Sequence, residues 1–255
     1  MNLDNIIAKR PNKTIYRDKD VAIKVFSSDY SKSDVLKEAL NHARVEETGL
    51  DMPKMLKVTS IDDKWAICYE FIEGETLLDL MHNNPEKLDD YLEQFVALQL
   101  KIHSKEAPNL IRLKDRLSKR IAKTPFDATT RFDLYSRLDE MPKHNKICHL
   151  DFDPSNIIVK DGKLFVIDWS HTAKGNAAAD AALTYILFIL DNEMEYARKY
   201  LELFCEKTNT DKEYLKKWIP IVAAAQIIIA DEKYHKLLNA LASGMNVDDL
   251  FEGDK

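Results

Sequence analysis

The chain has 255 residues, which is enough for one large domain or for two smaller ones that share a cleft. Hydrophobic residues make up 45% of the sequence and charged residues 31%, proportions that exclude a mainly disordered, collagen-like or membrane-spanning chain. The 43 acidic residues outnumber the 37 lysine and arginine residues, and the net charge is −6. Because no overall basic field would attract nucleic acid or an anionic membrane, we expect neither as a partner.

Cysteine and glycine positions exclude further classes. The three cysteines, Cys68, Cys148 and Cys205, are far apart and lack CxxC spacing, so we expect reduced thiols in a cytoplasmic protein. The six glycines are too dispersed to form either GxxxxGK[ST] or GxGxxG, which excludes P-loop and Rossmann nucleotide sites. The amino terminus has no apolar core of signal-peptide length, and Pro220 and Gln226 interrupt the longest apolar run.

Strand signals dominate the first seventy residues, in the order strand, strand, helix, strand, strand. Two β-rich runs within residues 14–26 flank an Asp-Lys-Asp turn, and the second run alternates Val21, Ile23 and Val25 with Ala22, Lys24 and Phe26. A helix capped by Ser33 or Asp34 follows, with Leu36, Leu40 and Ala43 as its expected buried face and Gly49 near its end. Two more strands are predicted at 56–59 and 65–71.

Helix signals dominate the remainder of the chain. Helices are predicted at 77–81 and 88–102, as short segments up to residue 138, and in a tail that runs from Asn176 through 215–241. One hairpin interrupts them, because Asp161-Gly162 has the chemistry of a two-residue type I′ turn. The sequence therefore predicts an α+β protein with a β-rich N-terminal nucleotide-binding lobe (1–72) and a mainly helical C-terminal catalytic and substrate-binding lobe (73–255).

The hairpin carries the most informative chemistry. With Asp161 and Gly162 as its turn, cross-strand partners have numbers that sum to 323, which places Asn156 opposite Ile167 and diagonal to Asp168. An amide oxygen and a carboxylate close together are hard ligands suited to a nucleotide-bound Mg²⁺. Asp151 precedes Asn156 by five residues, where a loop could hold it off the metal as a base for an attacking hydroxyl.

The N-terminal half offers the cation that phosphoryl transfer requires. Lys24 lies in the middle of a predicted strand on the same face as Ala22, which is small enough to leave room for a flat purine. Glu38 lies on the next helix, fourteen residues later, where its carboxylate could hold the Lys24 ammonium toward phosphates.

The order of these residues resembles the aminoglycoside phosphotransferase and choline kinase-like superfamily. HLDFDPSN at 149–156 matches the HxDxxxxN catalytic loop of that superfamily, and IDW at 167–169 matches its metal-binding segment. VAIKVF at 21–26 and EALNHARVEETGLDMPKML at 38–56 are similar to its lysine strand and glutamate helix, and YEFIEGETL at 69–77 looks like its hinge.

The resemblance implies a bilobal protein-kinase-like fold, ATP and Mg²⁺ as cofactors, and a role for each matching residue. Asp151 would be the catalytic aspartate, and Asn156 and Asp168 would bind Mg²⁺. Lys24 would contact the α- and β-phosphates and pair with Glu38. Backbone groups of Glu70 and Ile72 would bind adenine. His149 would support the catalytic loop, and Asp180 would brace it.

Three departures from the family pattern stand out. Leu150 replaces the glycine of the HGD motif found in many members, and Asp153 replaces a histidine two residues after the aspartate. Asp153 could contact a cation or the substrate. No glycine occurs before residue 49, so the phosphate-covering loop, expected within residues 7–14, uses ordinary residues, and we expect weaker nucleotide affinity.

Other readings of the same residues remain open. A protein kinase shares the five chemical residues, but Trp169-Ser170 stands where DFG would continue and no APE motif follows. A nucleotide-binding pseudokinase, or a metallohydrolase that uses His149, Asp151 and Asp153, is a further alternative. The favoured acceptor is a hydroxyl on a small molecule such as an amino sugar, an amino alcohol or another metabolite. Candidate acceptor contacts are the carboxylates of Asp191, Glu193, Glu195, Asp231 and Glu232 and the rings of Trp169 and Tyr234.

Overall fold

The computed structural model describes residues 2–245, and the chain divides into two compact units. The first unit comprises Met1–Pro85 and Pro154–His171, and the second comprises Glu86–Asp153 and Thr172–Lys255. The hairpin that was expected in the C-terminal lobe is thus packed with the N-terminal elements. The functional division into lobes 1–72 and 73–255 stays a prediction.

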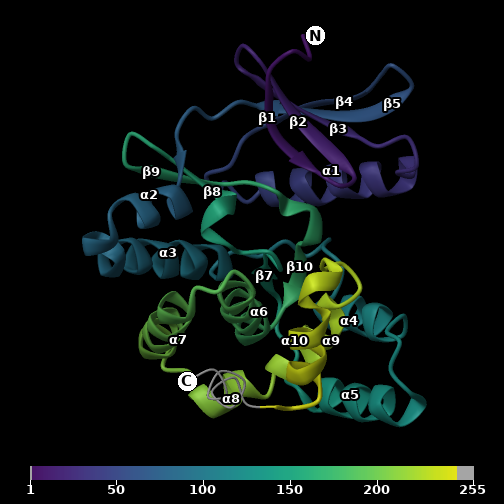
Figure 1. The fold of residues 1–255 in the computed structure, drawn as a ribbon, viewed down its shortest axis with the longest axis vertical. Helices are drawn as coiled ribbons and strands as arrows, with labels where there is room; N and C mark the ends of the chain where they lie inside the picture. The colour runs from purple at the N-terminus through teal and green to yellow at the C-terminus, as the bar shows by residue number, and fades with distance from the viewer. Residues whose placement is uncertain (1, 246–255) are drawn as a thin grey trace. The chain divides into compact units, whose positions relative to one another are not determined.

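The first unit is built on a five-stranded antiparallel sheet (Figure 1). Its order is β1-β2-β3-β5-β4, with bounds β1 Ile6–Arg10, β2 Lys13–Asp18, β3 Val21–Phe26, β4 Met55–Ile61 and β5 Lys64–Glu70. The four predicted strands are confirmed, and consecutive strands pair as hairpins, β2 with β3 and β4 with β5. The sequence analysis missed β1, an edge strand whose side chains are mostly exposed and which therefore has no buried alternating pattern.

Helix α1 (Lys32–Glu46) lies along one face of this sheet, as Figure 1 shows. It is capped by Ser31, whose side chain accepts a hydrogen bond from the Asp34 N–H, and not by Ser33 or Asp34. The predicted buried face was also wrong, because Leu36 and Leu40 are 45% and 48% exposed. The face that is buried holds Val35, Glu38, Ala39, Asn41, His42 and Val45, a mixture of polar and apolar residues that a purely apolar pattern does not identify.

The predicted hairpin is confirmed and belongs to a second sheet of the first unit, with order β6-β8-β9 (β6 Glu75–Thr76, β8 Ile157–Lys160, β9 Lys163–Val166). Asp161 and Gly162 have φ of 50° and 73°, the left-handed conformations that a type I′ turn requires. Ile157 pairs with Val166, so the register is the expected one. Helix α2 (Leu77–Asn83) follows β6.

The second unit is mainly helical, with one small sheet of β7 (Lys146–Cys148) and β10 (Ala173–Gly175). Its helices are α3 Leu88–His103, α4 Leu113–Ile121, α5 Ala128–Glu140, α6 Ala177–Leu190, α7 Met194–Thr208, α8 Lys212–Lys216, α9 Ile219–Gln226 and α10 His235–Ala242. The predicted segment 215–241 is broken into several helices, and Pro220 stands in the first turn of α9. Within residues 2–245, no helix has both the length and the apolar character needed to span a bilayer.

Candidate active site

Four charged side chains of the first unit form one cluster. The Lys24 Nζ donates to Glu38 Oε1 at 2.5 Å and to Asp168 Oδ1 at 3.1 Å. The Lys13 Nζ donates to the other carboxylate oxygen of Asp168, Oδ2, at 2.8 Å. The structure therefore brings together Lys24, Glu38 and Asp168, which the sequence singled out, and adds Lys13, which it did not.

Burial and pairing set the charges of this cluster. Burial alone would lower the pKa of Lys24, but the neighbouring Asp168 and Glu38 carboxylates raise it well above its ordinary value. Burial would likewise raise the pKa of Asp168, yet the Lys24 and Lys13 ammonium groups hold it well below its usual range. The Asp168 carboxylate thus lies beside two lysine side chains, and each of its oxygens accepts a hydrogen bond from one of them.

Asn156 and Asp168 both lie at the open end of the hairpin. The Ile167 N–H donates to the Asn156 carbonyl oxygen at 2.9 Å, the cross-strand contact that the register predicts. Asp168 has φ of 58°, a left-handed conformation rarely adopted by a residue other than glycine, and such strain is concentrated at functional sites. Among residues 2–245, no group of three or more His, Cys, Asp or Glu is arranged to hold a metal. One carboxylate and one amide nevertheless suit Mg²⁺, which keeps several waters and takes the rest of its ligands from phosphates.

Residues expected near adenine lie at the ends of the central strands. Ala22 is half-buried on β3 and pairs with Tyr69 of β5. The Glu70 N–H donates to the Lys54 carbonyl, and the Phe71 N–H donates to the Asp20 carbonyl. The adenine contacts expected of Glu70 and Ile72 stay a prediction. Because the Glu70 N–H is bonded to Lys54, the predicted contacts are those of the Glu70 carbonyl oxygen and the Ile72 N–H.

In the second unit, the predicted catalytic loop is anchored to its surroundings by side-chain hydrogen bonds. Leu150 has φ of 61° and is 1% exposed. Its N–H donates to Asp180 Oδ1 at 2.7 Å, while Asp180 Oδ2 lies 2.9 Å from His103 Nε2. Thr184 Oγ1 donates to the Phe152 carbonyl at 2.9 Å. Leu150 thus has a left-handed conformation of the kind that favours glycine, and the Asp180 carboxylate accepts a hydrogen bond from its N–H.

His149 and Asp151 lie in this loop. His149 is completely buried and packs edge to face against Phe152, with ring centroids 6.0 Å apart. This position is compatible with a supporting role. Burial lowers the pKa of Arg120, on α4, to about 10, although the negative charge of Asp151 opposes that shift. Arg120 is thus a neighbour of Asp151 that the sequence analysis missed, because no motif spacing connects α4 to the loop.

A second carboxylate, that of Asp191, lies near Asp153, which is 8% exposed. Asp191 is an exposed residue, yet partial desolvation and the charge of Asp153 raise its pKa, against the opposing effects of Tyr234 and Lys233. The Tyr234 hydroxyl donates to Asp191 Oδ1 at 3.5 Å. Asp153, Asp191 and Tyr234 therefore belong to one acidic neighbourhood of the second unit.

Trp169 occupies a different environment. Its ring is 1% exposed, and its Nε1–H donates to the Val166 carbonyl at 3.1 Å. A ring so enclosed presents no open face to a substrate. We therefore assign Trp169 to the core of the first unit and withdraw it as a contact of the molecule that accepts the phosphate.

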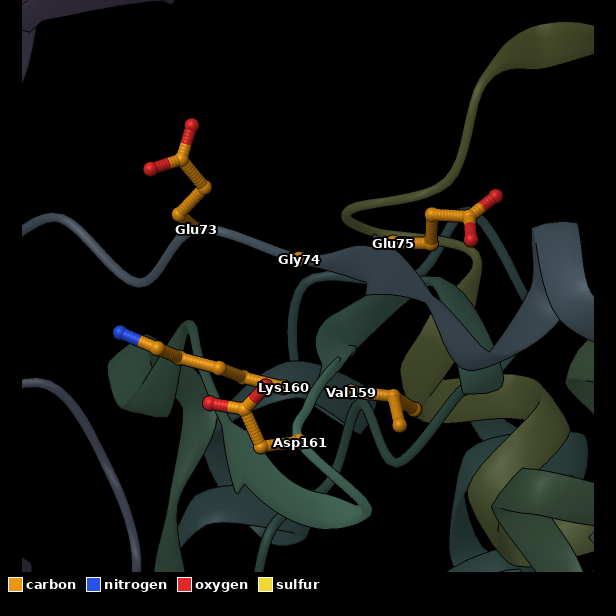
Figure 2. Close-up of a pocket in the computed structure, with 6 residues that line it drawn as sticks. All are labelled: Glu73, Gly74, Glu75, Val159, Lys160 and Asp161. Carbon is orange, nitrogen blue, oxygen red and sulfur yellow. The ribbon is translucent and has the colours of Figure 1, made fainter.

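A pocket in the first unit lies away from the charged cluster. Its lining consists of Glu73, Gly74, Glu75, Val159, Lys160 and Asp161 (Figure 2). Gly74 allows the chain to approach β8 closely, since a Cβ at this position would lie 2.2 Å from the Val159 carbonyl oxygen. The pocket contains no residue predicted for the site and marks the close contact of the β6 segment with the hairpin.

We expect Asp180→Ala to destabilise the protein by about 3 kcal/mol, because it leaves the buried Leu150 N–H and His103 without their acceptor. The pKa of Asp180 is lowered despite its burial, mainly by the His103 hydrogen bond. Its stabilising effect is therefore complete above the unfolded-state pKa near 4 and is lost as the pH falls. Urea unfolding at pH 7 and at successively lower pH measures the difference between variant and wild type, which should shrink in acid.

Asp133→Ala is the matched control for this experiment. Asp133 forms an exposed i,i+4 pair with Arg137 on α5, and we expect its removal to cost less than about 0.5 kcal/mol. An Asp180→Ala variant as stable as this control would contradict the bracing role of Asp180.

Comparison with known proteins identifies the relatives of this chain. The model of the phosphotransferase enzyme family matches residues 10–218, more than half of the chain. No curated protein matches it by sequence.

Solved structures share the fold. A thermostable mutant of aminoglycoside phosphotransferase APH(4)-Ia, in a ternary complex with ADP and hygromycin B, matches with a TM-score of 0.68 and 14% identity over 94% of this chain and 90% of that chain. ADP-bound aminoglycoside phosphotransferase APH(2'')-Ib matches with a TM-score of 0.62 and 17% identity over 94% and 92%. A choline/ethanolamine kinase family protein from Mesorhizobium loti matches with a TM-score of 0.57 and 13% identity over 92% and 83%. The expected α+β kinase-like fold is therefore confirmed.

Proposed function

Because the chain belongs to the phosphotransferase enzyme family, we propose that it is a small-molecule kinase that moves the γ-phosphate of ATP to a hydroxyl group. The observation that carries the proposal is the cluster in which Lys24 contacts both Glu38 and Asp168. A buried ammonium that is held by one carboxylate and placed beside a metal-binding carboxylate serves phosphoryl transfer, where positioning and charge stabilisation supply most of the rate.

Each residue has a defined task in this reaction. Asp151 accepts the proton of the attacking hydroxyl, and Lys24, oriented by Glu38, contacts the phosphates of ATP. Asn156 and Asp168 would hold Mg²⁺, which when bound neutralises charge on the phosphate oxygens. His149 and Asp180 keep the loop of Asp151 in place. Ala22, the Glu70 carbonyl and the Ile72 N–H face the adenine base.

The acceptor is a small molecule that carries positive charge, such as an amino sugar or an amino alcohol. The charges of buried Asp153 and exposed Asp191 repel each other, and the nearby Lys233 ammonium offsets this electrostatic cost only in part. A bound ammonium group relieves that cost. The aminoglycoside phosphotransferase and the choline/ethanolamine kinase family protein that share this fold are named for amine-bearing molecules.

Acceptor-stimulated ADP release tests both parts of the proposal. We expect pools of amino sugars and amino alcohols to raise Mg·ATP turnover above the level without acceptor, and neutral polyols of similar size to have little effect. Asp191→Asn should raise the KM for a cationic acceptor about tenfold, as expected for the loss of one charged contact. Glu202→Gln is the control, because Glu202 is an exposed residue of α7 with no assigned role.

Each outcome of this assay has a consequence. Stimulation by neutral polyols alone would contradict the cationic acceptor while leaving the kinase intact. A protein substrate phosphorylated in place of every small molecule would indicate a protein kinase.

A further inference from the structure

Lys13 belongs to none of the matched motifs, yet it contacts Asp168, the carboxylate proposed to bind the metal. Asp168 has two side-chain oxygens, and each accepts a hydrogen bond from a lysine. A divalent cation that binds Asp168 repels both ammonium groups, so its binding favours the displacement of one of them. Lys24 has a second carboxylate partner, Glu38, and only 8% of its side chain is exposed, whereas the side chain of Lys13 is 24% exposed. Lys13 is therefore the lysine that is easier to displace.

The position of Lys13 in the sheet brings it to the phosphates. Lys13 is the first residue of β2 and follows the tight turn at Pro11-Asn12. In the β2–β3 ladder, Lys13 pairs with Phe26 and Ile15 pairs with Lys24, so both lysines project from the same face of the sheet. The hairpin of β1 and β2 is the segment expected to cover the phosphates.

The hairpin also lacks the usual means of binding phosphate. No glycine precedes residue 49, so a glycine-rich loop that brings backbone N–H groups against phosphate oxygens cannot form here. A lysine ammonium is a point charge with three donors that binds phosphate without requiring a special backbone conformation.

We propose that Lys13 is a nucleotide-responsive phosphate contact: it neutralises Asp168 in the absence of nucleotide, and transfers its ammonium to the ATP phosphates when Mg²⁺ binds Asp168. This inference rests on the proposed function. One lysine side chain would then bind the phosphate oxygens, which a glycine-rich loop does in other nucleotide sites. Every charge stays paired in this exchange. The Lys13 ammonium moves from the Asp168 carboxylate to the ATP phosphates, and Mg²⁺ pairs with Asp168 in its place.

Calorimetric titration of Mg·AMP-PNP and of adenosine separates the phosphate contact from the base contact. We expect Lys13→Met to weaken Mg·AMP-PNP binding about tenfold or more, as for the loss of a charge-assisted hydrogen bond, and to leave adenosine binding within about twofold of wild type. Lys13→Arg keeps the positive charge and should restore most of the affinity. Lys57→Met, an exposed lysine on the edge strand β4, is the control and should match wild type.

The results distinguish this inference from the proposed function. If wild type binds Mg·AMP-PNP and Lys13→Met binds it equally well, Lys13 does not contact phosphate, although the kinase proposal stands. Equal weakening of adenosine and Mg·AMP-PNP by Lys13→Met would show a structural role and would also overturn the inference, as would failure of Lys13→Arg to restore affinity. If wild type binds no Mg·AMP-PNP, the proposed function itself fails.

Discussion

Replacement of Asp151 by asparagine should lower turnover by roughly 10²- to 10⁴-fold, the range expected for loss of a general base. Asparagine is nearly isosteric and cannot accept the hydroxyl proton as a carboxylate does, so the variant should fold normally. Nucleotide affinity should stay within about threefold of wild type, because the assigned phosphate contacts come from other residues. Steady-state ADP release and calorimetric ATP binding, measured on the same preparations, test this expectation.

Asp115→Asn is the matched control for Asp151→Asn. Asp115 is an exposed aspartate in the first turn of α4, and its substitution should leave turnover unchanged. Turnover of Asp151→Asn within tenfold of wild type would show that Asp151 is not the base. ATP binding by wild type, without turnover on any acceptor, would favour the pseudokinase alternative.

Replacement of Asp168 by alanine should abolish the dependence of ATP binding on Mg²⁺ and reduce turnover at least about 100-fold, since a metal on the phosphates supplies several kcal/mol of charge stabilisation. The variant also releases Lys13 and Lys24 from their shared carboxylate. In the presence of a chelator, we therefore expect Asp168→Ala to bind ATP at least as tightly as wild type. Calorimetry with and without Mg²⁺ measures both effects.

Asp63→Ala controls for the backbone conformation in this comparison. Asp63 lies in the exposed β4–β5 turn and has φ of 61°, close to the 58° of Asp168, so both substitutions place alanine in a left-handed conformation. If Asp168→Ala retains the full Mg²⁺ dependence of wild type, the metal assignment is wrong.

The sequence predicted those parts of the candidate site that depend on local periodicity and turn chemistry. The Asp161-Gly162 turn sets the hairpin register, and that register places Asn156 beside Ile167 and one residue from Asp168. Alternation along β3 identified the strand face of Lys24. The salt bridge to Glu38 then follows from packing of α1 against that face.

The parts that were missed depend on tertiary packing. The buried face of α1 is mixed in polarity because it carries Glu38 to the cluster, so Leu36 and Leu40 misled the assignment. Lys13 belongs to an unpredicted hairpin, and its contact with Asp168 spans 155 residues of sequence. The burial of Trp169 could not be read from a motif that places it next to Asp168.

Chemical identification of the product tests the central proposal most directly. Wild-type protein, Mg·ATP and the acceptor that gives the largest ADP release should yield a phosphate monoester of that acceptor, detected by phosphorus NMR, in amounts equal to the ADP formed. Asp151→Asn should yield almost none in the same time. ADP accompanied by inorganic phosphate alone, with no acceptor monoester from the wild type, would contradict the assignment of this chain as a small-molecule kinase.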